Sequence, residues 1–421
     1  MKPLNIAIVL GSFPTVSETF IVNQITSLID NGHTVSIYSY RKGNTQKIHN
    51  SILTYNLLEN VVYKEKPPIG KLKKVYHFLK LILQHLFNIN WGLLYKSLSF
   101  LNYGKKAINL KAFYERKFFI LNKDFDVVHV HFATNAVDIA TYKSEGFLKQ
   151  SKLVVTFHGY DINPSKVEFY KTHYKKIFEQ TDSFTVNTIY TKEILVQVNP
   201  ALTNVFILPV GLDTNLFKRK GNQCATNEPF KIVYCGRLIS LKGGLLLPLI
   251  IEELLNRGFD NINLKIIGDG ELKKLLKDNI ERLKLKSIIE LVGSLTQEEL
   301  ISVFNDSNVL LLPGIRDTFD GSEEAQGLVI QEAQSMELPV VVSDVGGMKY
   351  GLITNKTGFV VKENDINGFA DCIEALIKDP QRAKKMGEEG RKFVEENYNS
   401  KDLVDKLISI YKNILYIRNL S

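Results

Sequence analysis

The sequence has few cysteines and no long apolar run, the features typical of secreted and membrane-spanning proteins. Its 421 residues include only three cysteines and no Cys-x-x-Cys pair, so neither a disulfide framework nor a zinc ribbon is expected. Such sparse cysteine is typical of a reducing, cytoplasmic setting. No run approaches the roughly 20 apolar residues that span a bilayer. The opening apolar run, residues 6–10, is short and no small-residue cleavage site follows it, which favours a buried first strand over a signal peptide.

What is present is an average globular composition on a chain too long for one core. Apolar residues make up 44% and charged residues 23%, which excludes a mainly disordered, collagenous or coiled-coil protein. A typical domain has roughly 100–200 residues, so this length predicts two domains. The 53 Lys and Arg exceed the 45 Asp and Glu and give a net charge of +8. Such an excess suits nucleic acid, a membrane surface or a phosphorylated substrate.

Short β-branched runs recur along the chain, and amphipathic helical patterns follow them. The runs are almost continuously apolar, as buried parallel strands are. Alternation of strand and helix predicts doubly wound parallel sheets. The predicted strands are residues 6–10, 34–38, 127–131, 153–157, 183–186, 231–234, 264–267, 289–292, 309–312 and 340–343.

The strand and helix pattern restarts near residue 230, after a polar and irregular stretch at 211–228. This break predicts a linker between two Rossmann-like halves. We therefore expect a first domain over residues 1–212 and a second over 229–398. A last helix, expected over 401–417 within the segment 399–421, would pack back on the first domain.

One segment, residues 64–117, concentrates positive charge. It holds 12 Lys and Arg against two Glu, a net charge of +10 that exceeds that of the whole chain. A basic amphipathic helix with aromatic residues suits an anionic membrane surface. A helix packed on the sheet with its lysines in water fits the same pattern, and both descriptions can hold together. The apolar residues at helical spacing, and the two aromatic residues after them, are Leu72, Val75, Tyr76, Leu79, Ile82, Leu83, Leu86, Trp91 and Phe100.

Two loops with candidate chemistry follow expected strands. Gly11 lies in a turn before a helix expected from Ser17, where glycine lets the backbone approach an anion at a helix N-terminus. A plain strand-to-helix turn is the alternative there. Arg237 and Lys242 lie on one loop at 235–244, at the strand end where ligands of such sheets bind. Two cations in that place can clamp a diphosphate, and two solvated surface cations are the alternative.

The most specific stretch is residues 323–332, in which seven residues separate Glu324 from Glu332. A helix is expected to begin near Gly327, with Glu324 at its mouth and its N-terminus facing phosphate. The inner carboxylate, Glu332, is placed to accept hydrogen bonds from ribose hydroxyls, as acidic residues do in nucleotide-binding folds. An exposed acidic helix is the alternative.

Taken in order, these stretches resemble glycosyltransferase family 4, whose members have the GT-B fold. The resemblance covers nearly the whole chain and implies an α/β protein of two Rossmann-like doubly wound domains that face a central cleft. The opening and the His-Gly-Tyr-Asp stretch are most similar to transferases that build bacterial exopolysaccharides of the colanic-acid type. The supporting stretches are Phe-Pro-Thr-Val-Ser-Glu-Thr-Phe at 13–20, Val-His-Val-His-Phe at 128–132, Phe-His-Gly-Tyr-Asp at 157–161, Leu-Pro-Val-Gly-Leu-Asp at 208–213, Gly-Arg-Leu at 236–238 with Lys-Gly at 242–243, Ile-Gly-Asp-Gly at 267–270, and the two glutamates.

The resemblance implies retaining transfer from a UDP- or GDP-sugar, with no cofactor and no essential metal. Carried over by position, Arg237 and Lys242 would hold the donor diphosphate, Glu324 the transferred sugar and Glu332 the ribose. The remaining implied site residues are Gly327, Leu328 and Val329, whose N–H groups would bind phosphate, His158 near the reacting sugar carbon, Gly11 near the diphosphate, and Glu18 and Asp161 on the acceptor side. Three places depart from the family pattern: Ala325 and Glu337 stand where glycine is usual, and Met348-Lys349-Tyr350 stands where Ile-Pro-Glu is usual.

These observations predict a retaining glycosyltransferase that extends a glycan or polyprenyl-diphosphate-linked acceptor in surface polysaccharide biosynthesis. It would work in the cytoplasm, with peripheral contact at the inner face of the membrane. The alternatives are a nucleotide-sugar epimerase or phosphorylase of the same fold, or a non-catalytic sugar-nucleotide-binding protein. No RNP-like or helix-turn-helix signature supports a nucleic-acid partner.

Two further patterns suggest a metal site but have simpler explanations. Asp124-Phe125-Asp126 matches a DxD metal motif, yet it also leads directly into the strand expected at 127. His129 and His131 point to one face of that strand, where partly buried histidines near the acceptor cleft are expected in preference to a metal pair.

Overall fold

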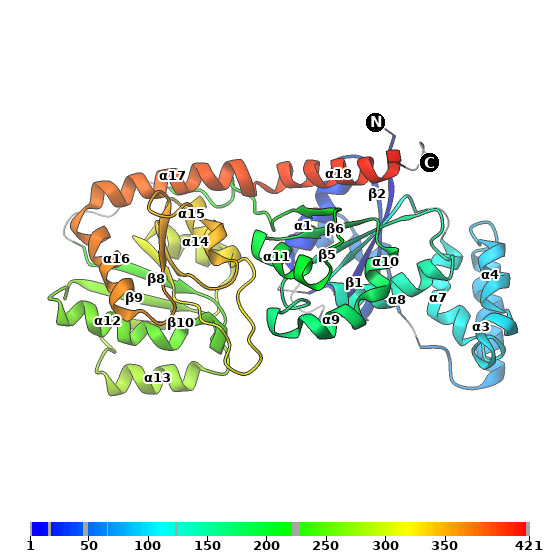
Figure 1. Ribbon diagram of the computed structural model, residues 1–421, viewed down its shortest axis with the longest axis horizontal. Coiled ribbons are helices and arrows are strands. Elements are labelled where there is room, and N and C mark those ends of the chain that lie inside the picture. The colour runs from blue at the N-terminus through cyan, green and yellow to red at the C-terminus, as the bar shows by residue number, and fades with distance from the viewer. Residues whose placement is uncertain are drawn as a thin grey trace.

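Two parallel α/β sheets form the protein, as its computed structural model shows (Figure 1). The structure describes residues 2–15, 18–44, 49–64, 66–122, 125–220 and 228–417. The first sheet has seven strands in the order β3-β2-β1-β4-β5-β6-β7, and the second has six in the order β10-β9-β8-β11-β12-β13. Every strand pair is parallel. The predicted doubly wound α/β class is confirmed.

The ten predicted strands all occur, and three more lie at sheet edges. The strands of the first sheet are β1 (Asn5–Phe13), β2 (Thr34–Lys42), β3 (Val61–Tyr63), β4 (Val127–His131), β5 (Lys152–Phe157), β6 (Ser183–Val186) and β7 (Val205–Ile207). Those of the second are β8 (Phe230–Cys235), β9 (Ile262–Ile267), β10 (Ile289–Gly293), β11 (Val309–Leu312), β12 (Val340–Ser343) and β13 (Gly358–Val361).

Helices cover both sheets and extend beyond the first one. In the first half they are α1 (Thr19–Asp30), α2 (Asn50–Thr54), α3 (Lys71–Gln84), α4 (Trp91–Ser97), α5 (Phe100–Tyr103), α6 (Lys105–Ile108), α7 (Lys111–Leu121), α8 (Ala133–Ser144), α9 (Val167–His173), α10 (Lys175–Gln180) and α11 (Ile189–Val198). In the second half they are α12 (Leu247–Asn256), α13 (Lys273–Arg282), α14 (Gln297–Asn305), α15 (Leu328–Ser335), α16 (Ile366–Lys378), α17 (Pro380–Tyr398) and α18 (Ser400–Ile417). Short 3₁₀ turns occur at Leu57–Asn60, Pro164–Lys166, Ser240–Lys242, Gly244–Leu246 and Met348–Gly351.

The central strands are buried on both faces, which explains why their sequences are continuously apolar. In β1, Ala7 and Val9 face one core, whereas Ile6 and Ile8 face the core on the other side. This division follows the two-residue period of a strand. A single core lies around the second sheet.

The last two helices join the halves. Residues of α17 pack in the core of the second sheet. Those of α18, among them Leu407 and Tyr411, pack in the core that the first sheet shares with α1, so the two helices run along both sheets (Figure 1). The chain passes between the halves at two adjacent places, where the Leu212 N–H donates to the Tyr398 carbonyl at 3.0 Å and the Ser400 N–H donates to the Leu212 carbonyl at 3.0 Å. Residues 221–227 of the expected linker lie outside the described part of the chain.

Candidate active site

A pocket lies between the two sheets and takes residues from each. His158, Tyr160 and Asn163 line it from the first half, and Arg237 and Glu324 line it from the second. Both contributions come from loops after strands, because parallel strands bring their carboxyl ends to one edge of each sheet. The structure therefore places three of the predicted site residues, one from the first half and two from the second, around one space.

The second-half wall of this pocket carries fixed charge. The ammonium of Lys242 forms an ion pair and hydrogen bond with the carboxylate of Glu324, and both side chains are largely buried. Glu324 also accepts a hydrogen bond from the Gly327 N–H at 3.2 Å. Burial opposes ionisation of Glu324, but Lys242 and the nearby N–H groups hold its pKa below the usual value. Arg237 is exposed at the carboxyl end of β8 and lines the same pocket.

The loop between Arg237 and Lys242 depends on a glycine that follows it. Gly243 has φ +66°, a left-handed conformation that favours glycine. A Cβ atom built there would lie 1.6 Å from the Pro313 carbonyl oxygen. A residue with a side chain would clash there. The close contact between Gly243 and the loop after β11 therefore fixes the position of the neighbouring Lys242.

The helix expected near Gly327 begins at the next residue. Gly327 is the N-cap of α15 with φ +70° and its carbonyl accepts the Ile330 N–H at 2.8 Å, so the N–H groups of the first turn that remain for a ligand belong to Leu328 and Val329. Glu332 follows one turn inside and is partly buried, and burial raises the pKa of its carboxyl to about 7. Glu332 and Leu328 line a neighbouring pocket with Thr19, separate from the one that Glu324 lines.

One imidazole, His158, lines the first-half wall, and two more buried imidazoles lie behind it. His158, directly after β5, hydrogen-bonds through Nε2 to Nδ1 of His131 at 3.0 Å, and the two rings stack at 5.3 Å. His131 stacks in turn on His129 at 4.4 Å. Burial lowers the pKa of all three and brings that of His131 to about 3. His158 Nδ1 and His131 Nε2 are buried and have no hydrogen-bond partner among the described residues.

The structure corrects the expectation for His129 and His131, which are fully and not partly buried. His129 lies inside the first half, where its Nδ1 pairs with the Tyr411 hydroxyl at 2.6 Å and its Nε2 pairs with the Thr156 hydroxyl at 2.6 Å. Tyr411 belongs to α18, so the C-terminal helix contacts the histidine stack that reaches His158. Sequence reasoning missed this connection, although histidines two apart on a buried strand signal a shared face.

Asp161 shapes the loop that carries His158. Its Oδ1 accepts the N–H groups of His158 and Gly159 at 3.0 Å each, and its Oδ2 accepts the Ala133 N–H at 2.7 Å. The side chain is 1% exposed, and burial raises the pKa of its carboxyl to about 6 despite these bonds. Because both oxygens are occupied by backbone donors, we assign Asp161 to holding this loop and not to contacting an acceptor.

The other predicted positions lie around the edge of the first sheet. Gly11 lines a separate pocket with Arg41 and Asn135, and a Cβ atom there would lie 3.1 Å from the Asn135 side chain. Glu18 is the N-cap of α1, without a side-chain capping bond, and burial raises its pKa. The helix expected from Ser17 begins at Thr19, and Ser17 itself lies outside the described residues.

The DxD stretch gives no metal site within the described residues. Asp124 lies outside that part of the chain. The other carboxylate, Asp126, accepts the Asn5 N–H at 2.8 Å and so holds the start of β1. Across the described part, no group of three or more His, Cys, Asp or Glu side chains is arranged to hold a metal ion.

The two halves touch through the loop that precedes α15. The hydroxyl of Thr188 donates to the Ala325 carbonyl at 2.9 Å, and the amide of Asn163 donates to the Asp320 carbonyl at 3.0 Å. The Gln326 amide exchanges two hydrogen bonds of 2.9 Å with the backbone of Val210. These contacts from the first half hold the loop that carries Glu324, a connection that sequence reasoning also missed.

The three places where the sequence departs from the family pattern each have a distinct structural environment. Ala325 points at Gly159 across the domain contact, because a Cβ atom on Gly159 would lie 2.2 Å from the Ala325 Cβ. Glu337 has φ +58°, a backbone conformation that glycine adopts without strain. Met348 is fully buried, and its Cε lies 2.7 Å from where a Cβ on Gly314 would be.

Two Rossmann-like sheets with a pocket between them are the architecture of the GT-B fold. Residues 17–216 match the family model "Glycosyltransferase Family 4", and residues 218–393 match "Glycosyl transferases group 1". The chain belongs to glycosyltransferase family 4.

Two curated relatives are similar over nearly the whole chain. The colanic acid biosynthesis glycosyltransferase WcaL of Escherichia coli is 26% identical, with 97% of this chain and 99% of WcaL covered. The amylovoran biosynthesis glycosyltransferase AmsK of Erwinia amylovora is 28% identical, with 96% and 98% covered. The protein is thus related to transferases of exopolysaccharide biosynthesis.

Solved structures show the same fold. A glycosyltransferase from Rickettsia africae aligns with a TM-score of 0.69 at 20% identity over 99% of each chain. The Anabaena protein HepE in complex with UDP aligns with a TM-score of 0.70 at 13% identity, covering 97% of this chain and all of HepE.

Proposed function

We propose that the protein is a retaining glycosyltransferase that moves a hexosyl group from a UDP- or GDP-sugar to a glycan or polyprenyl-diphosphate-linked acceptor. The names of its relatives WcaL and AmsK support a role in bacterial surface polysaccharide biosynthesis. The second domain, residues 229–398, would bind the donor, and the first, residues 1–212, would bind the acceptor. The complex of HepE with UDP supports a nucleotide donor.

The observation that carries this proposal is the convergence of Arg237, the Lys242–Glu324 pair and His158 on one pocket between the domains. When the bond between sugar and diphosphate breaks, negative charge grows on the leaving nucleoside diphosphate. Fixed cations and helix N–H groups already in place stabilise that charge without reorganising. Arg237, Lys242 and the first turn of α15 are the groups that meet this requirement, and we propose that they do so without an essential metal.

The remaining roles follow from position around the same centre. Glu324, held ionised by Lys242, would accept hydrogen bonds from the hydroxyls of the transferred sugar. Glu332 would accept them from the ribose. His158, kept neutral by burial, would lie beside the reacting carbon and can donate or accept one hydrogen bond there through Nδ1.

Four further residues complete the proposed site. Glu18 would lie on the acceptor side of the cleft, at the start of α1. Gly11 would give the diphosphate room to approach β1, and the N–H groups of Leu328 and Val329 would bind its oxygens. Closure of the domains over both substrates would exclude water, which matters because hydrolysis competes with transfer.

A panel of UDP-, GDP- and ADP-sugars tests the donor assignment. We expect one donor to raise the melting temperature and to be hydrolysed slowly without acceptor. Absence of stabilisation by every nucleotide would contradict the proposal. With acceptor present, the anomeric configuration of the product, read by NMR, separates retaining from inverting transfer. An epimerised donor or a sugar phosphate as product would favour the epimerase or phosphorylase alternative.

Substitution tests the pocket itself. We expect Arg237→Ala and Lys242→Ala each to abolish transfer, since removing one preorganised donor at a developing charge costs about 10²- to 10³-fold in rate. Glu324→Ala should do the same, because it removes the acceptor of the sugar hydroxyls and leaves Lys242 without its partner. Lys277→Ala, an exposed cation on α13 away from the pocket, is the matched control and should leave the rate unchanged. Full activity in two of the three pocket variants would defeat the site assignment.

A further inference from the structure

Helix α3 has apolar residues on two opposite sides, and only one side is packed. Phe78, Leu81 and Ile82 pack against the core of the first domain. On the same inward side, the hydroxyl of Tyr114 in α7 donates to the Lys74 carbonyl at 3.0 Å. These inward contacts attach α3 to the domain, yet no residue of the helix is fully buried.

The other side of α3 presents a second apolar stripe to solvent. Leu72, Tyr76, Leu79 and Leu83 recur every three or four residues and so lie on one helical face. Leu72 is 88% exposed and Leu83 73% exposed. Of the seven apolar residues that the sequence placed at helical spacing, Ile82 is the one that packs inward, so the predicted stripe is mainly the exposed one.

Exposed apolar residues also occur after α3 along the sequence. We call residues 66–110, which contain α3 to α6, the arm. Phe87 and Leu101 of the arm are 88% and 97% exposed, and the single tryptophan, Trp91, is 53% exposed. Exposed apolar residues scattered singly need no explanation, but a gathered set on one segment marks an interaction surface.

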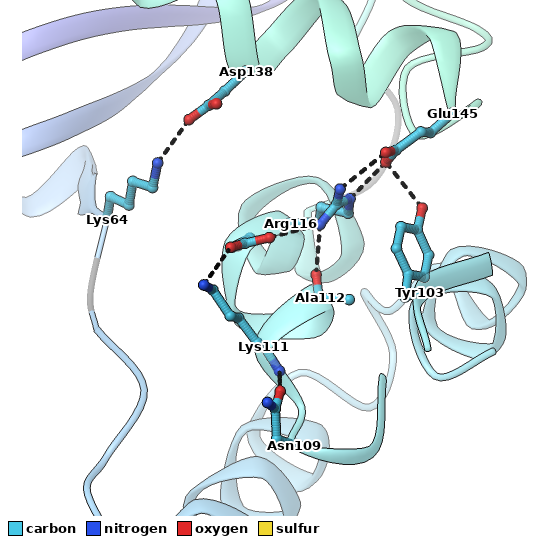
Figure 2. Close-up of polar contacts among 9 residues, drawn as sticks. Lys64, Tyr103, Asn109, Lys111, Ala112, Arg116, Asp138 and Glu145 are labelled. Atoms are coloured by element: carbon cyan, nitrogen blue, oxygen red, sulfur yellow. Dashed lines mark hydrogen bonds and ion pairs between the residues drawn. The ribbon is translucent and has the colours of Figure 1, made fainter. Parts of the chain in front are cut away.

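The lysines of the arm differ from the cations that attach it. Lys64 pairs with Asp138 at 2.8 Å, Lys111 pairs with Glu115 at 3.9 Å, and the buried Arg116 pairs with Glu145 at 2.8 Å (Figure 2). These cations lie at the two ends of the arm and serve the fold. Those within the arm that are exposed and pair with no described acidic residue are Lys66, Lys71, Lys73, Lys80, Lys105 and Lys106.

Arg116 helps to attach the C-terminal end of the arm to the first domain. Its guanidinium lies 4.7 Å from the ring centre of Tyr103 and 4.6 Å from that of Tyr142, with the Glu145 carboxylate beside it. Tyr103, at the end of α5, donates its hydroxyl to the same carboxylate at 2.9 Å (Figure 2). This ion pair, with the aromatic rings beside it, connects α5 and α7 to the end of α8.

We propose that the arm is the surface by which the protein docks on an anionic phospholipid bilayer. The sequence has no Asp or Glu from residue 66 to residue 114, so every charged side chain of the arm itself is a cation or a histidine. Lysines attracted by anionic headgroups and flanking aliphatic and aromatic residues are the combination that binds an interfacial helix to such a membrane. An acidic protein partner would explain the lysines but leave the apolar stripe without a lipid-like environment.

The placement of the arm suits peripheral docking. It lies at the end of the molecule opposite the second sheet (Figure 1), so lipid contact there leaves the pocket between the sheets uncovered. None of the described helices is long and apolar enough to cross a membrane. Binding through the arm would therefore be reversible and dependent on ionic strength.

Sedimentation with phosphatidylcholine vesicles, with and without about one-third phosphatidylglycerol, tests the proposal. The full-length protein should pellet with the anionic vesicles, stay in solution with the neutral ones, and release as salt is raised. The variant Lys73→Gln/Leu79→Ser/Lys80→Gln should lower the partition coefficient at least about tenfold, since each lysine near an anionic surface contributes roughly fivefold.

A matched triple substitution on the second domain controls for charge and exposed surface. Lys274→Gln/Leu275→Ser/Lys277→Gln changes three exposed residues of α13 in the same way and should leave vesicle binding unchanged. Both variants should keep the melting temperature and donor hydrolysis of the parent, so failure of docking is distinguishable from failure of the proposed activity. Three results would overturn the proposal: equal binding to neutral vesicles, an equal loss in both variants, or self-association that the arm variant abolishes.

Discussion

The two walls of the interdomain pocket are built from opposite chemistry. The second-domain wall holds ionised groups, with Lys242 and Glu324 paired and Arg237 beside them. The first-domain wall holds the imidazole of His158, with His131 stacked behind it, and burial keeps both neutral. The wall that would face a departing diphosphate thus carries charge in place, whereas the wall that would face the sugar offers shape and single hydrogen bonds.

Burial alone explains the neutral wall but not the charged one. Glu324 and Glu332 are only eight positions apart, yet the pKa of Glu324 is lowered and that of Glu332 is raised to about 7. Burial acts on both carboxyls, and the difference is the ammonium of Lys242, which only Glu324 contacts. A charged wall therefore requires partners, and a buried group without one becomes neutral near physiological pH.

The largest expected effect comes from breaking the pair on the charged wall. Lys242→Met leaves the carboxylate of Glu324 buried without its cation, which should cost about 3 kcal/mol of the free energy of unfolding at pH 7. Urea unfolding measures it. The double variant Lys242→Met/Glu324→Gln should recover most of that loss, because no unpaired charge remains. A loss below about 1 kcal/mol in the single variant would mean that solvent screens the pair.

The neutral wall should lower the free energy of unfolding at acidic pH. His131 has a pKa of about 3 in the folded protein, lowered by burial from 6.5, so the unfolded chain takes up its proton first as the pH falls. The stability that depends on neutral His131 is complete above pH 6.5 and is lost as the pH falls towards 3, by about 2 kcal/mol at pH 5. His131→Asn should therefore reduce the loss of stability between pH 7 and pH 5, measured by urea unfolding at both. An unchanged loss would show that His131 is not held neutral.

Glu332 should show the opposite pH dependence on the second domain. Burial raises the pKa of its carboxyl to about 7, so its contribution to stability is complete below pH 4.5 and is lost as the pH rises through 7. Because the side chain is partly exposed, we expect Glu332→Gln to gain only about 1 kcal/mol relative to the parent between pH 5 and pH 8. Thermal unfolding at the two values measures the gain. Glu298→Gln, an exposed carboxylate on α14, is the control and should not change with pH.

The fold was predictable from the sequence except at the edges of the sheets. The ten strands found from apolar runs include every central strand, because burial on both faces requires a continuous run. The three missed strands, β3, β7 and β13, each end a sheet and pair on one side only. Two of them, β3 and β7, have just three residues each. Such strands need neither length nor a fully apolar sequence, so their pattern resembles that of a loop.

The candidate site was predictable where it depends on local sequence, and not where it depends on contacts between distant elements. The turn at Gly327 and the cations Arg237 and Lys242 each lie within one strand-to-helix unit. In contrast, the hydrogen bond between His131 and His158 joins two strands, and the Tyr411 contact with His129 joins residues 282 positions apart. Neither residue pair has a spacing that a sequence pattern could reveal.

The smallest expected effect concerns the backbone that follows α15 in the second domain, which carries the charged wall. Glu337 follows α15 with φ +58°, a conformation that costs a side-chain-bearing residue roughly 1–2 kcal/mol. Glycine removes this strain but loses roughly 0.5–1 kcal/mol through the greater freedom of its unfolded chain. Glu337→Gly should therefore stabilise the protein by roughly half a kcal/mol, seen as a small rise in melting temperature. Lys385→Gly, at an exposed position within α17, should instead cost about 1 kcal/mol. If both glycines destabilise equally, the left-handed backbone at Glu337 carries no strain.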